Sequence, residues 1–116
     1  MSDRPAFGED EIASRRKLVE TAQAIIDGKL PFLEGAVIVN GLETKVGGVV
    51  FPDKDFMVFT GIVSETDALP LEAQRKFWNP EALARLEPEI KKKEEWARSI
   101  ALQACKNLAE RFSKSP

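Results

Sequence analysis

Apolar residues recur at helical spacing from Glu9 onward. They fall on one face of a helix, namely Ile12, Val19, Ala22 and Ile26, with Leu18 and Ile25 on its flank. Polar side chains, Arg15 among them, take the other side, and Gly28 is a typical helix stop. The pattern predicts a helix that ends near Gly28 and leaves residues 1–8 as a flexible leader.

The clearest periodicity lies at the other end of the chain, between Pro88 and Phe112. Two rows of apolar residues follow each other there: Trp96, Ile100, Ala104 and Leu108, and beside them Ala97, Ala101, Cys105 and Phe112. Asn79 and Pro80 form a good start for a shorter preceding helix. We expect Glu87–Pro88 to interrupt that helix and Pro88 to open the long one.

The middle of the chain is less regular. Pro31 favours the start of a helix, although the β-branched run 37–39 is also compatible with a strand. Asp53 or Asp55 could cap a third helix, while a strand or hairpin over residues 49–63 is the alternative. A short helix containing Leu71, Phe77 and Trp78 is expected after a break at residues 64–70.

These elements predict an all-α fold, a compact bundle of about four to five helices with a long C-terminal helix. The alternative is an α+β fold with a small sheet or hairpin in residues 36–63. No repeat or linker divides the chain, so we expect one domain over residues 9–116. With 116 residues, 43% of them apolar, the chain is large enough for one hydrophobic core.

The expected cellular location follows from the number of cysteines and from the length of the apolar stretches. Cys105 is the single cysteine, which excludes an intrachain disulfide. The first five residues lack an apolar signal core, and no apolar run approaches the roughly 20 residues that span a bilayer. We therefore expect a cytoplasmic protein that does not bind membranes.

Charge is unevenly distributed along the chain although its net value is only -2. Residues 18–74 carry nine acidic and three basic groups, whereas residues 75–116 carry ten basic and six acidic groups. Such asymmetry can steer a partner, or the two segments can pair with each other across the fold. The acidic balance argues against a general nucleic-acid binder.

Candidate chemistry is sparse. The chain has no histidine, which removes the commonest general base and metal ligand, and it has no phosphate-binding glycine loop. Helix capping and turn formation explain the carboxylates Asp53, Asp55 and Asp67 better than a metal site does. Cys105 lies in an apolar helical setting that is typical of a buried structural thiol. We predict no catalytic residue, no metal and no cofactor.

Two surface features remain. Lys91–Lys93 has acidic neighbours and no interleaved aromatic residues, as a solvated helix face does. Trp96 falls on the apolar ladder and is expected in the core. Trp78, beside Phe77 between turns, is the better candidate for an exposed anchor, although core packing is favoured there too.

Several short segments resemble a group of small uncharacterised bacterial domains. The matching residues are Leu33-Glu34-Gly35-Ala36, Phe56 with Phe59, Ser64-Glu65-Thr66-Asp67, Leu69-Pro70, Trp78, Pro80-Glu81-Ala82-Leu83 and Ala104-Cys105 with Leu108. The resemblance covers residues 15 to 112 and carries no catalytic residues over. In size and sparse chemistry the chain also looks like bacterial immunity proteins, which bind and block a cognate toxin.

The leading hypothesis is a non-enzymatic protein-binding domain, in its narrowest form an immunity protein that neutralises a basic toxin. Glu65 and Asp67 would steer the partner and Trp78 would anchor it. The alternatives are a small-ligand or carboxylate-dependent enzyme domain and a homo-oligomeric scaffold built on a homodimer.

Overall fold

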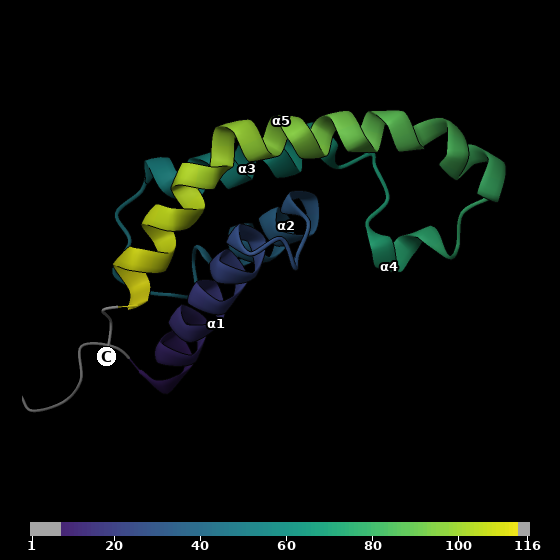
Figure 1. Ribbon diagram of the computed structural model, residues 1–116. Coiled ribbons are helices and arrows are strands. Elements are labelled where there is room, and N and C mark those ends of the chain that lie inside the picture. The colour runs from purple at the N-terminus through teal and green to yellow at the C-terminus, as the bar shows by residue number, and fades with distance from the viewer. Residues whose placement is uncertain (1–7, 114–116) are drawn as a thin grey trace, which may run out of the picture.

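Within residues 8–113 the chain forms five helices joined by turns and by a longer loop between the second and third. The computed structural model describes residues 8–113, and its helices are α1 (Glu9–Ile26), α2 (Phe32–Leu42), α3 (Lys54–Thr66), α4 (Glu72–Arg75) and α5 (Pro80–Ser113) (Figure 1). The all-α prediction with a long C-terminal helix is confirmed. The expected leader at residues 1–8 lies outside the described residues except for Gly8, the N-cap of α1.

The alternative sheet in residues 36–63 is wrong, because residues 8–113 contain no strand. Pro31 is the N-cap of α2, and the carboxylate of Asp53 caps α3 by accepting a hydrogen bond from the amide of Asp55 at 3.0 Å. The β-branched run 37–39 lies inside α2 and leaves Val39 fully buried. Strand propensity is a weak preference that capping and burial override here.

Two glycine positions shape the contact between α1 and α2. Gly28 takes a φ of 76°, which suits a glycine that ends α1. Gly35 lies so close to α1 that a Cβ there would come within 2.3 Å of Cδ1 of Ile25. The absence of a side chain at Gly35 therefore lets α1 and α2 pack closely.

The core lies where α1, α2, α3 and the C-terminal half of α5 meet. Its fully buried large side chains come from all four helices and from the loop after α2: Phe56, Phe59, Leu18, Ile25, Ile62, Leu108, Val39, Val46 and Cys105. The buried residues Ala97, Ala101 and Ala104 are small, which favours close packing of the other helices on α5, and α1 makes the most extensive contact with it.

Two predictions about helix faces are wrong. On α5 the second row is buried throughout, whereas the first row is buried only at Ala104 and Leu108, since Ile100 is 42% exposed and Trp96 is half-buried. On α1 the buried side includes Arg15, which the apolar pattern placed on the polar side. Arg15 is buried because it bonds carbonyl groups of the loop after α2, as described below.

The predicted break at Pro88 is also wrong, because α5 runs unbroken from Pro80 to Ser113. A proline inside a helix removes the hydrogen bond to the carbonyl four residues before it. That carbonyl belongs to Ala84, and both Ala84 and Pro88 are exposed, so water can replace the lost donor.

The molecule has two parts that differ in burial. No side chain from residue 71 to residue 96 is buried, and we call this segment the arm. The remainder, namely α1, α2, α3 and residues 97–113 of α5, is called the body. Figure 1 shows α4 and the first turns of α5 at the end of the molecule farthest from the start of α1. Within residues 8–113 no helix is both long and apolar enough to span a bilayer.

The short helix of the arm differs from the one predicted by the sequence. Its helix α4 covers only Glu72–Arg75, so Phe77 and Trp78 follow it in a turn instead of belonging to it. The backbone amides of Phe77 and Trp78 bond the carbonyls of Gln74 and Arg75, each at 3.0 Å. This turn fixes the backbone of the aromatic pair while its side chains remain exposed.

Candidate functional site

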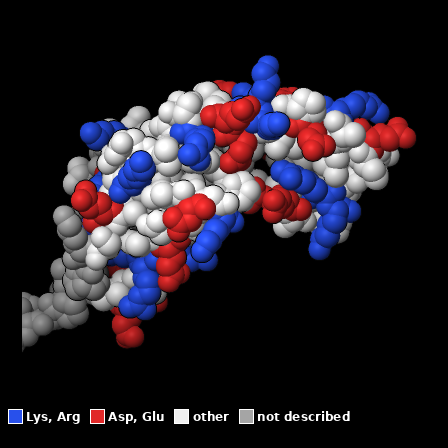
Figure 2. All heavy atoms as spheres, in the orientation of Figure 1, with Lys and Arg blue, Asp and Glu red and all other residues white. Residues whose placement is uncertain are grey.

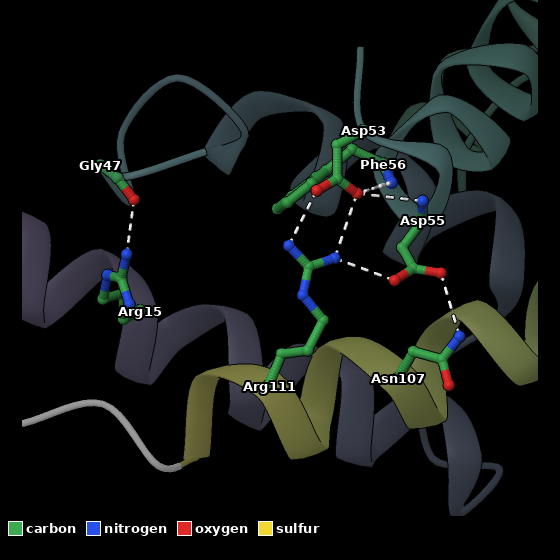
Figure 3. Close-up of polar contacts among 7 residues, drawn as sticks. All are labelled: Arg15, Gly47, Asp53, Asp55, Phe56, Asn107 and Arg111. Atoms are coloured by element: carbon green, nitrogen blue, oxygen red, sulfur yellow. Dashed lines mark hydrogen bonds and ion pairs between the residues drawn. The ribbon is translucent and has the colours of Figure 1, made fainter. Parts of the chain in front are cut away.

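The most elaborate polar arrangement joins the start of α3 to the end of α5. Arg111 donates to both oxygens of Asp53, at 3.1 and 2.8 Å, and to Asp55 Oδ2 at 2.9 Å (Figure 3). Asn107 Nδ2 donates to the other oxygen of Asp55 at 3.0 Å. The hydrogen bond from Arg111 is the main reason why the pKa of Asp53 lies below its ordinary value, and it raises the pKa of Arg111.

A second arginine anchors the same region from α1. Arg15 donates through Nε to the carbonyl of Val46 at 2.6 Å and through Nη2 to the carbonyl of Gly47 at 2.5 Å. Its guanidinium carbon lies 4.8 Å from the ring centroid of Phe112. Burial lowers the pKa of Arg15. Together Arg15 and Arg111 fasten the loop between α2 and α3 to the two helices beneath it.

This network is suited to holding a loop and not to performing chemistry. All four carboxylate oxygens of Asp53 and Asp55 already accept hydrogen bonds from arginine, asparagine or backbone amides. A carboxylate so engaged cannot readily accept a proton from a substrate. The network therefore does not favour a carboxylate-dependent active site.

The remaining candidate for chemistry is Cys105 in α5. Its side chain is fully buried, which confirms the expected structural thiol. Desolvation by burial raises its pKa to about 12, so the thiol stays protonated at neutral pH. Within residues 8–113 no group of three His, Cys, Asp or Glu side chains is arranged to hold a metal ion.

The three residues predicted to bind a partner lie in different places. Glu65 is exposed in the last turn of α3 and pairs with Lys93 at 3.7 Å. Asp67 is exposed at the C-cap of α3. Trp78 lies in the arm and is 38% exposed. The groove that Glu65 lines, about 410 Å³ in volume, includes neither Asp67 nor Trp78.

Phe77 is the apolar residue of the arm that sequence reasoning underrated. Its side chain is 80% exposed, with the Lys76 ammonium 5.2 Å from its ring centroid. The signal was present in the sequence, since Phe77 adjoins Trp78 between two turns. Two adjacent exposed aromatic residues are unusual on a surface and are enriched where proteins bind partners.

The arm is attached to the body by polar contacts near its two ends. The amide of Glu72 donates to the carboxylate of Glu34 in α2. On α5, Glu94 accepts hydrogen bonds from the first amides of α2, those of Phe32 and Leu33. Between these attachments, Leu86 and Ile90 also pack, partly buried, against the core, whereas Phe77 and Trp78 are exposed.

The uneven charge of the chain is offset in part by pairing between its two segments. Basic residues of the C-terminal segment meet acidic residues of the preceding one in the pairs Arg111–Asp53, Arg111–Asp55 and Lys93–Glu65. Figure 2 shows acidic and basic side chains interspersed on the visible face, without a large region of one sign. Part of the charge asymmetry between the two segments is therefore accounted for by ion pairs within the fold.

Comparisons of the chain with protein-family models, curated proteins and solved structures gave no match.

Proposed function

We propose that the chain is a non-enzymatic protein-binding domain that recognises its partner through the arm. The observation that carries this proposal is the exposure of Phe77 and Trp78 side by side on a segment without a buried side chain. Aromatic side chains supply large contact area at low entropic cost and dominate binding hot spots. The turn that follows α4 presents both rings on a defined backbone.

The narrower form of the proposal is an immunity protein that blocks a basic toxin. Glu65 and Asp67 are exposed carboxylates at the end of α3, where they could speed the approach of a cationic partner. Lys93 offsets part of the charge of Glu65, so the steering contribution rests more on Asp67. Phe77 and Trp78 would supply most of the binding free energy.

A photo-crosslinking experiment in the cells that make the protein tests the broader proposal. A benzophenone amino acid replaces Phe77, and in the control it replaces Lys17, which is exposed on α1. We expect a discrete adduct with one protein from position 77 and none from position 17. The absence of an adduct at position 77, or identical adducts from both positions, would contradict recognition by the arm.

The immunity form has its own test once a partner is captured. Changing both Glu65 and Asp67 to Lys should slow association by about tenfold at low salt and have little effect at high salt. The purified domain should also inhibit the activity of the partner. An unchanged association rate and salt dependence would remove the steering role of these two residues.

A further inference from the structure

A line of four side chains runs along the solvent face of α5. Arg85, Glu89, Lys92 and Trp96 are spaced by four, three and four residues, which places them on one side of the helix. Arg85, Glu89 and Lys92 are exposed and Trp96 is half-buried. We call these four residues the α5 stripe.

The charged side chains of the α5 stripe make few ion pairs within the described part of the chain. Among the described residues no ion pair engages Glu89 or Lys92, and Arg85 makes only a 3.9 Å contact with Glu81, in which its side chain is 79% exposed. An exposed contact of this length contributes little to stability. The stripe is therefore available to another molecule.

A groove of about 410 Å³ lies beside the C-terminal part of the α5 stripe, from Glu89 to Trp96. Its walls are formed by Glu65, Glu89, Lys92, Lys93 and Trp96. The Lys93 ammonium lies 5.4 Å from the ring centroid of Trp96. Trp96 is half-buried against the core, so a cationic side chain from a second molecule would meet its indole through this groove.

The order of residues in the α5 stripe is complementary to itself when reversed. If two copies of α5 lie antiparallel with the two-fold axis between residues 90 and 91, Glu89 of each copy lies opposite Lys92 of the other. The same axis places Arg85 of each copy opposite Trp96 of the other. A two-fold interface repeats each contact twice, so one arrangement yields two ion pairs and two cation–π contacts.

We infer that the partner of the α5 stripe is a second copy of this chain, bound antiparallel through residues 85–96. This interaction goes beyond the proposed function, because it uses neither Phe77 nor Trp78 and leaves both available to a different protein. The contacts are polar and surface-exposed, so the dimer is weak and sensitive to salt.

Charge reversal at positions 89 and 92 tests the antiparallel geometry. In E89K the two ion pairs become two Lys–Lys contacts, and in K92E they become two Glu–Glu contacts. We expect each variant alone to raise the dimer dissociation constant at low salt by about tenfold or more. An equimolar mixture of E89K and K92E restores both ion pairs in the heterodimer and should return the dissociation constant to near the wild-type value.

Sedimentation equilibrium of the purified chain at low and high salt provides the measurement. The matched control is the pair E87K and K91E, which reverses charges in the same helical segment on a different side and should leave dimerisation within about twofold of wild type. R85A should weaken the dimer by about three- to tenfold through loss of two cation–π contacts. Circular dichroism checks that each variant remains helical.

The inference is overturned by any of three results. The wild-type chain could stay monomeric at low salt up to about 1 mM, which corresponds to less than about 4 kcal/mol of binding free energy. Dimerisation could be unaffected by E89K and K92E, which would place the interface elsewhere. The mixture could fail to restore association, which would exclude the antiparallel pairing. An adduct at position 77 with another protein would leave the proposed function standing in each case.

Discussion

The body and the arm use the same kinds of residue in opposite ways. In the body, Phe56 and Phe59 are fully buried and Arg111 is bonded to two carboxylates. In the arm, Phe77 is exposed and Arg85 makes only a long contact at the surface. These groups of the body are satisfied internally, whereas Phe77 and Arg85 of the arm face solvent, although the body also exposes Val37, Met57 and Ile100. This contrast is the basis for the proposal that the arm recognises other molecules.

Truncation of a phenylalanine gives the largest expected contrast between the two parts. Phe59→Ala should lower the free energy of unfolding by about 3–5 kcal/mol, because it removes a fully buried ring and leaves a cavity. Phe77→Ala should change it by less than about 0.5 kcal/mol. Urea denaturation of both variants checks this, and equal losses would show that the arm is part of the core.

Removal of an arginine should give a smaller contrast. Arg111→Met leaves Asp53 and Asp55 without their cation, and we expect a loss of about 2 kcal/mol, less than for a fully buried pair because Arg111 is partly exposed. Arg98→Met, on an exposed position of the same helix, is the matched control and should cost less than about 0.5 kcal/mol. Similar midpoints in urea for both variants would contradict a stabilising role of the network.

The network of Arg111 with Asp53 should also make the free energy of unfolding depend on pH, with a smaller effect than that of removing Arg111. The pKa of Asp53 is lower in the folded protein than in the unfolded chain, so its stabilising contribution is present above the unfolded pKa of about 3.9. That contribution is lost as the pH falls through the folded pKa. We expect urea midpoints of the wild type to decline more steeply below about pH 4 than those of Asp53→Asn.

A double variant separates this effect from general acid unfolding. Since Arg111 is the main cause of the lowered pKa, adding Asp53→Asn to Arg111→Met should alter the acid decline much less than it does in the wild type. An equal change in both backgrounds would mean that Arg111 does not set the pKa of Asp53.

Local signals in the sequence predicted most of the helices. Asp53 and Pro31 are residue types that cap or begin helices, and they predicted the starts of α3 and α2. The apolar periodicity of α1 and α5 extended over enough residues to predict both helices. The break predicted at Pro88 was wrong because the energetic cost of a proline inside a helix depends on whether water reaches the carbonyl that the proline leaves unpaired. That exposure is a property of the fold.

Long-range partners could not be predicted from the sequence. Arg15 stands beside two further cations and looks solvated, but it bonds carbonyls that follow 31 and 32 residues later. Arg111 meets Asp53 across a separation of 58 residues. No local pattern encodes such pairs. For Trp78, in contrast, the position between two turns marked it as the better candidate for exposure, although core packing was favoured; its side chain is 38% exposed.

Hydrogen–deuterium exchange of the dilute wild-type protein tests the central claim most directly. The account predicts that amides of residues 74–90 exchange through local opening, at least about a hundredfold faster than the α5 amides of residues 100–108, which exchange only on global unfolding. Addition of urea should then accelerate exchange strongly in the body and little in the arm. Equal protection and equal urea dependence in the two regions would contradict the division into a closed body and an open arm.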